Sequence, residues 1–294
     1  MTGRRARVVA LCATAAALLG AAPASAGVLD GIVTGYQTAS GSWLSALAPV
    51  AQRTFGILAG LEIAIGALMW VINHRSVDEM LLSFIRKILV LGVFFAFLTE
   101  FPIWVPRIVQ GFETAGQTAG RVKLSPSAVM KAGVEVGTKL LEAANDAGML
   151  ISASTLIIAP IVTLIVMIAF ICIAAQLVMT LVESYIVITG GVIFLGFAAF
   201  RGTAPLADKY IVYAVQVGVK LFLLYLMVGT GLSLTGQWTQ DLVQVGVLGA
   251  NLQPLFDVLG GTIVFALLVW KIPTQVSYFL TQSVHLHLRE ALTD

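Results

Sequence analysis

The fold class is decided by the stretch from Met149 to Phe200, MLISASTLIIAPIVTLIVMIAFICIAAQLVMTLVESYIVITGGVIFLGFAAF. It holds about 50 residues with Glu183 as its single charge, whereas one membrane crossing needs about 20 apolar residues. The whole chain is 59% hydrophobic and 11% charged, and a soluble domain carries about 25% charged residues. So few charges cannot cover a water-soluble globule of this size. The sequence therefore predicts an all-α, polytopic membrane protein.

Four more apolar runs have the length of a membrane helix, at about 55–73, 81–104, 210–232 and 254–270. The long run 149–200 crosses the bilayer either once or twice, and the bias of Lys and Arg toward the cytoplasm discriminates between the two. With one crossing, the segment 233–253, which has no Lys or Arg, is periplasmic. The cytoplasmic cations are then Arg75, Arg86, Lys87, Arg201, Lys209, Lys271 and Arg289. We therefore predict five crossings, a periplasmic N-terminus and a cytoplasmic C-terminus.

In the five-crossing arrangement, the last part of the long run, about 178–200, has to return without crossing. We expect a re-entrant or protein-buried hairpin that turns at Gly190-Gly191, because irregular backbone at membrane depth is tolerated only under protein or water.

The remaining segments are shorter and more polar. Residues 1–26 have the basic, apolar and small-residue regions of a cleavable signal peptide, and an uncleaved first helix is the alternative. Residues 27–54 form a periplasmic amphipathic segment with a break at 38–42. The transmembrane pair 55–104 leads to a periplasmic insert, 105–148, in which Ser125 and Pro126 start an amphipathic helix. A transmembrane core, 149–272, precedes a short cytoplasmic tail, 273–294.

Glu62 and Lys220 fall near the centres of two predicted spans. A lone charge there costs at least about 2.5–3.5 kcal/mol, so we predict that they form an ion pair that holds helices together. Pairing with Glu183 and a pore-lining or proton-coupled role are the alternatives. Tyr213 and Gln216 share a helical face with Lys220, which points to the interior of a bundle or to a conduit.

Small residues also recur in the first span, at Gly56, Gly60 and Ala64. Such a ladder lets two helix backbones approach closely, within one subunit or between subunits. The sequence contains no P-loop, no nucleophile elbow and no metal-binding spacing. We therefore expect a protein that is not an enzyme and that has no catalytic residue, cofactor or metal.

Several stretches, taken in order, resemble the TrbL family of type IV secretion and conjugal transfer systems. They are Ser83–Leu89 (SFIRKIL), Glu100–Trp104 (EFPIW), Leu124–Ser127 (LSPS) and the longest, Gly196–Gly229, with Arg201, Asp208, Lys209, Tyr210 and Gly218–Phe222 (GVKLF).

The resemblance implies an inner-membrane platform or channel subunit. It would form a ring-like homo-oligomer at the base of the pilus or stalk and help DNA or protein cross the envelope. The implied partners are other inner-membrane, stalk and minor pilus subunits, secretion ATPases, the lipid bilayer and, transiently, the transferred DNA or protein. A small-solute transporter and a membrane assembly factor without a conduit are the competing interpretations.

Overall fold

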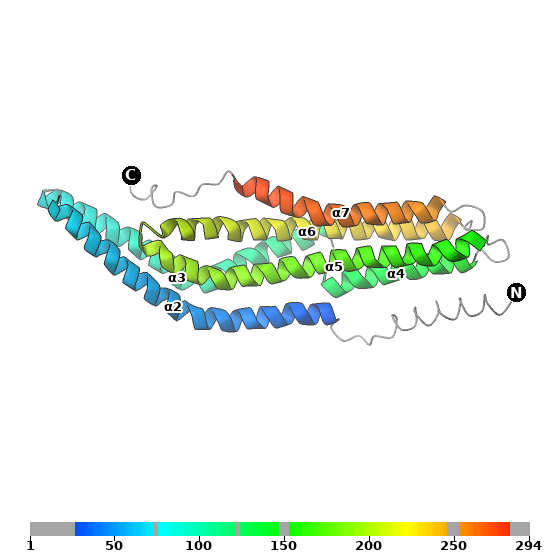
Figure 1. Ribbon diagram of the computed structural model, residues 1–294, viewed down its shortest axis with the longest axis horizontal. Helices are drawn as coiled ribbons and strands as arrows, with labels where there is room; N and C mark the ends of the chain where they lie inside the picture. The colour runs from blue at the N-terminus through cyan, green and yellow to red at the C-terminus, as the bar shows by residue number, and fades with distance from the viewer. Residues whose placement is uncertain (1–26, 73–75, 122–123, 147–152, 246–252, 283–294) are drawn as a thin grey trace. The chain divides into compact units, whose positions relative to one another are not determined.

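The computed structural model describes residues 27–72, 76–121, 124–146, 153–245 and 253–282 (Figure 1). Within these residues the regular structure is helical and there is no strand. The predicted signal peptide and the last part of the predicted C-terminal tail lie outside the described residues. The elements, in order, are α2 (Val28–Ile72), α3 (Val77–Gly120), α4 (Pro126–Asp146), α5 (Ala153–Gly196), the short 3-10 helix η2 (Phe197–Ala199), α6 (Ala204–Val245) and α7 (Gln253–Gln282).

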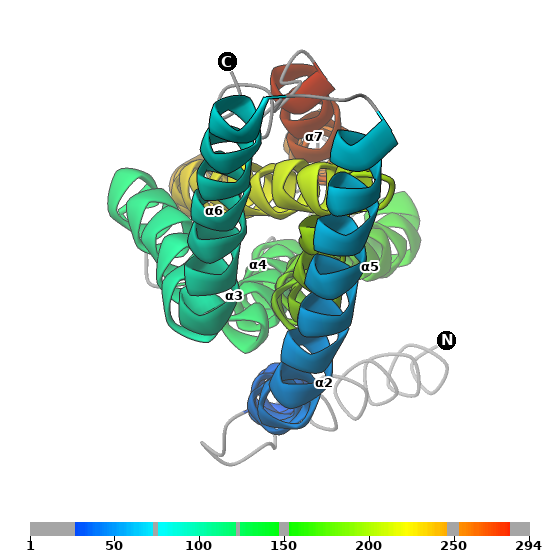
Figure 2. The same cartoon turned by 90° about the vertical axis from the view of Figure 1, so that its left-hand side faces the viewer.

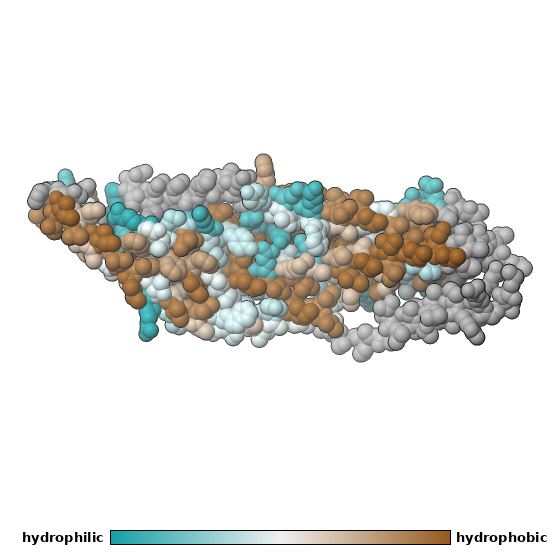
Figure 3. All heavy atoms as spheres, in the orientation of Figure 1, coloured by the Kyte–Doolittle hydropathy of each residue, from teal (hydrophilic) through white to brown (hydrophobic). Residues whose placement is uncertain are grey.

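Five of these helices, all except α4 and η2, are long and apolar enough to cross a bilayer. Their outward-facing side chains are themselves apolar. Ile157 on α5, Leu68 on α2 and Leu267 on α7 are each at least 60% exposed, and Figure 3 shows apolar surface along α2 and α5. In water such a surface would drive aggregation, whereas lipid solvates it. The prediction of an all-α polytopic membrane protein is confirmed.

The helices are longer than the predicted spans, because polar and proline residues do not interrupt them. The break predicted at 38–42 is wrong, since α2 continues through it. Thr38 Oγ1 donates to the Thr34 carbonyl and Ser42 Oγ donates to the Ala39 carbonyl, so these hydroxyls are satisfied inside the helix. Similarly, α3 continues through Pro102 and Pro106, past residue 104 where the second predicted span ends.

The predicted hairpin turn at Gly190-Gly191 is also wrong. Helix α5 runs through both glycines to Gly196, and the chain reverses only in η2 and the residues before α6. Thr203 Oγ1 stabilises this reversal by donating to the Phe197 carbonyl at 2.7 Å. Gly191 instead provides room for a neighbour, because a Cβ there would overlap the Tyr210 ring of α6.

Helix α4 begins where the sequence predicts. Ser125 Oγ accepts a hydrogen bond from the Ala128 amide at 3.2 Å, which caps the helix in front of Pro126. A second cap comes from α2, because the Asp30 carboxylate accepts from the Ser127 amide at 3.1 Å. Val129, Gly133, Val136 and Leu140 are buried on one face of α4, which agrees with the predicted amphipathic helix.

The chain divides into two compact units. The first comprises Met1–Val33, Gly116–Met179 and Leu223–Pro273, and the second comprises Thr34–Ala115, Thr180–Phe222 and Thr274–Asp294. In the first unit α4 packs on α5, where Gly133 gives room to the Phe170 side chain. There α3 also meets α6 at Gly120 and Gly229, where a Cβ on Gly229 would lie 2.6 Å from the Gly120 carbonyl oxygen. Close backbone contact of this kind requires glycine on both helices.

In the second unit, α2 and α3 form a helical pair, which faces the viewer in Figure 2. Their aromatic side chains meet at Phe55 and Phe95, with ring centroids 5.6 Å apart, and at Trp70 and Phe84, 6.1 Å apart. The α5–α6 turn packs against α2, and Gly196 lies so close that a Cβ there would be 2.9 Å from the Ala51 carbonyl oxygen. This unit contains both ion clusters described below.

Candidate functional site

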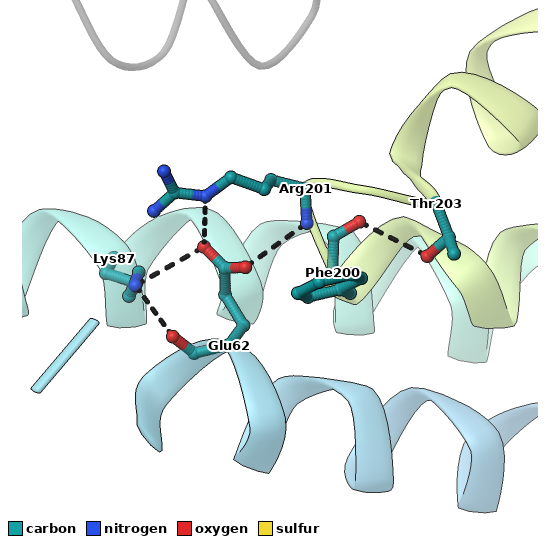
Figure 4. A network of polar contacts seen from close by, with 5 residues as sticks. All are labelled: Glu62, Lys87, Phe200, Arg201 and Thr203. Carbon is teal, nitrogen blue, oxygen red and sulfur yellow. Dashed lines mark hydrogen bonds and ion pairs between the residues drawn. The ribbon is translucent and has the colours of Figure 1, made fainter. Parts of the chain in front are cut away.

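The first polar cluster is built on Glu62, whose side chain is 1% exposed (Figure 4). Its Oε1 accepts from Lys87 Nζ on α3 at 3.3 Å and from Arg201 Nε, in the turn before α6, at 3.3 Å. Its Oε2 accepts from the backbone amide of Arg201 at 3.2 Å. Lys87 Nζ also donates to the Glu62 carbonyl at 2.9 Å. One buried carboxylate therefore ties together α2, α3 and the α5–α6 turn.

The predicted ion pair between Glu62 and Lys220 is wrong. Glu62 meets Arg201, at the start of the turn, whereas Lys220 lies sixteen residues into α6, about 24 Å along the helix axis. The prediction assumed that the centre of an apolar run marks the depth of a residue. The helices extend far beyond a single crossing length, so this assumption fails.

The second cluster joins α5 to α6 around Glu183, the residue considered as an alternative partner of Lys220. Lys220 Nζ lies 2.6 Å from Glu183 Oε2, and Tyr213 Oη donates to Glu183 Oε1 at 2.8 Å. The Lys220 and Glu183 side chains are 16% and 29% exposed. Gln216 lies on the same helical face, half-buried, and its side chain makes no hydrogen bond within the described part of the chain. The predicted polar stripe of α6 is thus engaged by α5.

In both clusters a carboxylate on an apolar helix is paired with a cation from a neighbouring segment. An unpaired ion at membrane depth is expensive, and each carboxylate here has at least one cation within 3.3 Å. A third polar contact is neutral: Ser40 and Thr189 hydroxyls lie 2.7 Å apart between α2 and α5. These contacts fix helices relative to one another within the second unit. Among the described residues no group of three His, Cys, Asp or Glu could hold a metal ion.

The small-residue ladder of α2 does not serve packing among the described residues. Gly56, Gly60 and Ala64 are all exposed, and a Cβ added at either glycine would meet nothing within 4 Å. Close helix contacts use other glycines, which the sequence interpretation missed: Gly196, and the pair Gly120 and Gly229. A ladder pattern shows where close approach is permitted but not whether a partner helix uses it.

The sequence interpretation also missed Lys87 and Arg201 as the partners of Glu62. From the sequence, both residues are interpreted only as cytoplasmic cations and as parts of the family-like stretches. The available signal was charge balance: a buried glutamate on α2 needs a cation, and an antiparallel helix pair that turns near residue 75 brings Lys87 to the level of Glu62.

Known proteins are similar in sequence to most of this chain, including the helices that carry both ion clusters. The family model described as "TrbL/VirB6 plasmid conjugal transfer protein" matches residues 59–272, which includes both ion clusters. "Conjugal transfer protein TrbL" of Rhizobium radiobacter is 31% identical over 217 residues, 73% of this chain and 54% of the relative. "Probable conjugal transfer protein TrbL" of Sinorhizobium fredii (strain NBRC 101917 / NGR234) is 29% identical over 205 residues, 69% of this chain and 51% of the relative.

The chain thus spans about half the length of the curated relatives it matches. The family match nevertheless extends over well more than half of this chain, from the middle of α2 to α7, and agrees with the membrane helices found here. The chain belongs to the TrbL/VirB6 family of plasmid conjugal transfer proteins.

Proposed function

We propose that this protein is an inner-membrane platform or channel subunit of a type IV secretion system of the conjugative kind. In this role it forms an oligomer at the base of the pilus or stalk and helps DNA or protein substrate cross the envelope. The observation that carries the proposal is the family match over residues 59–272, in a chain with five membrane-length helices. Energy for transport would come from partner ATPases.

The proposed orientation follows from the distribution of cations. Arg86 and Lys87 lie near the start of α3, and Arg201 and Lys209 lie around the α5–α6 turn. The tendency of positive charge to remain in the cytoplasm supports a cytoplasmic location for these parts. The N-terminus is then periplasmic, as is α4, and the C-terminus is cytoplasmic.

Self-association is supported by the exposed ladder on α2. Gly56, Gly60 and Ala64 leave a flat strip along a helix that is otherwise bounded by large apolar side chains such as Ile57. Two helices that meet through such strips approach closely and gain van der Waals contact. In this proposal the strip meets a second copy of the chain in the platform, together with other subunits of the secretion system.

A mating assay tests the proposed role. Deletion of the gene should abolish plasmid transfer, and the wild-type gene supplied in trans should restore it. Glu62→Ala should restore little, because it leaves Lys87 and Arg201 without their carboxylate, whereas Glu79→Ala, which changes an exposed carboxylate on α3, should restore transfer fully. Unchanged transfer in the deletion strain would contradict the proposal.

The transporter alternative predicts a different result in vitro. A small-solute carrier would purify as a species that binds a metabolite without other subunits. The platform role predicts instead that the full chain in nanodiscs has the mass of an oligomer and copurifies with secretion subunits. For the orientation, a cysteine at Lys209 in a Cys172→Ser background should react with an impermeant thiol reagent only in permeabilised cells.

A further inference from the structure

The cluster around Glu62 has more positive than negative charge, and the excess lies at its surface. Among the residues that the structure describes, it contains one carboxylate, Glu62, and two cations, Lys87 and Arg201. The Lys87 side chain is 14% exposed, whereas that of Arg201 is 64% exposed. The unneutralised charge is therefore presented by Arg201.

Glu62 binds Arg201 through Nε and the backbone amide and does not contact its two Nη atoms. The carboxylate accepts from both the backbone amide and Nε of Arg201, which fixes where the side chain leaves the turn. In Figure 4 the two Nη atoms point away from Glu62. Within the described part of the chain, the hydrogen bonds and the ion pair of Arg201 use its Nε and backbone amide and leave both Nη atoms without a partner. Two parallel N–H donors on a planar guanidinium match the geometry of a phosphate and bind it in a bidentate manner.

The surroundings of Arg201 favour a lipid over a soluble anion. Phe194 on α5 and Leu206 on α6 are both more than 40% exposed and lie on either side of the turn. The ring of Trp70 lies beside Lys87, with Nζ 5.9 Å from its centroid. Tryptophan is enriched at membrane–water interfaces, where phospholipid phosphates lie. A phospholipid suits these surroundings, because its phosphate can meet the guanidinium while its acyl chains meet the neighbouring apolar side chains.

We propose that Arg201, oriented by Glu62, binds the phosphate of an anionic phospholipid. Phosphatidylglycerol and cardiolipin fit the site, because the net charge of the cluster attracts an anionic headgroup more than a zwitterionic one. Acyl chains extend along the exposed apolar residues of α5 and α6. The inference is independent of the transfer role, since it concerns the lipid contacts of the folded chain.

Native mass spectrometry of the purified full chain tests the proposal. Protein from mixed micelles with equal amounts of phosphatidylglycerol and phosphatidylethanolamine should retain the former preferentially. Arg201→Gln should reduce that preference about tenfold, which corresponds to the loss of one charge-assisted hydrogen-bonding group. Lys209→Gln is the matched control, because it removes an exposed cation from the same region and leaves the Glu62 cluster intact. It should keep the preference.

Thermal unfolding shows whether each variant is folded. If Arg201→Gln does not fold, Arg201→Lys replaces it. Lysine keeps the positive charge but lacks the two parallel N–H donors of the guanidinium, so the preference for phosphatidylglycerol should fall. Equal retention of both lipids by the wild type, or an equal loss in Lys209→Gln, overturns the proposal. Displacement by millimolar inorganic phosphate would identify a free-phosphate site, and preferential binding of a single-stranded oligonucleotide would identify a nucleic-acid site. Either result also overturns it, whereas the mating assay would be unaffected by any of these outcomes.

Discussion

Replacement of Lys220 by methionine tests the assignment of ion-pair partners. Methionine keeps most of the length and apolar character of the side chain but removes the ammonium group that lies 2.6 Å from Glu183 Oε2. The variant leaves the Glu183 carboxylate, 29% exposed, with the Tyr213 hydroxyl as its remaining partner within the described residues. An uncompensated and mostly buried charge is the expected consequence.

The size of the effect follows from the burial of the pair. Removal of one partner from a buried ion pair costs about 3–5 kcal/mol. The pair is partly exposed, and Tyr213 still donates to Glu183, so we expect the lower end, about 3 kcal/mol. For a protein of this size that corresponds to a fall of roughly 6–12 °C in the unfolding midpoint.

A double-mutant cycle supplies the assay. Addition of Glu183→Gln to Lys220→Met should recover about half of the loss, because the remaining pair of side chains is uncharged. Addition of Glu62→Gln instead should give no recovery, since Glu62 contacts Lys87 and Arg201. Unfolding of each variant is followed by circular dichroism in one detergent. Recovery with Glu62→Gln, and none with Glu183→Gln, would refute the partner assignment.

Three further substitutions test helix contacts by the same unfolding measurement. Gly191→Ala should cost about 1–3 kcal/mol, because its methyl group would overlap the Tyr210 ring, whereas Gly190→Ala, with open space around it, should stabilise α5 by about 0.5–1 kcal/mol. Gly229→Ala should cost a similar 1–3 kcal/mol because backbone atoms cannot move aside, and Gly60→Ala should be tolerated. Asp30→Ala should cost about 0.5–2 kcal/mol through loss of the cap on α4. Equal midpoints within either glycine pair, or no change for the aspartate, would contradict the contact concerned.

The fold class could be predicted because composition alone decides the solvent. A chain with 11% charged residues has too few to face water, and membrane-length apolar runs become helices because lipid offers backbone groups no hydrogen bonds. The start of α4 was predicted for a local reason as well. Ser125 and Pro126 suit the cap and first turn of a helix in any context, and the Ser125 hydroxyl does cap the Ala128 amide.

The contacts between helices could not be predicted in the same way, because they depend on where each helix lies. The sequence correctly indicates that Glu62 needs a cation, but it predicts Lys220 as the partner, and only the position of the α5–α6 turn brings in Arg201. Gly190-Gly191 illustrates the same limit. Two adjacent glycines suit a turn, but a glycine also suits a helix that packs closely on a tyrosine. Here α5 continues through both glycines, and Gly191 leaves room for the Tyr210 ring.

The length of α5 has a consequence for what surrounds the protein. Its 44 residues extend for about 66 Å, and even at a tilt of 40° the helix would cover about 50 Å of depth, against a hydrocarbon core of about 30 Å. The outward-facing side chains of α5 are apolar from Ile157, which is 66% exposed, to Ile186, which is 50% exposed. This stripe rises by about 44 Å, which amounts to about 41 Å of depth at a typical tilt of about 20° and to about 33 Å at about 40°, so acyl chains cover nearly all of it only at the steepest tilt. At an ordinary tilt we therefore expect neighbouring polypeptide to cover the end of the stripe that projects from the hydrocarbon core.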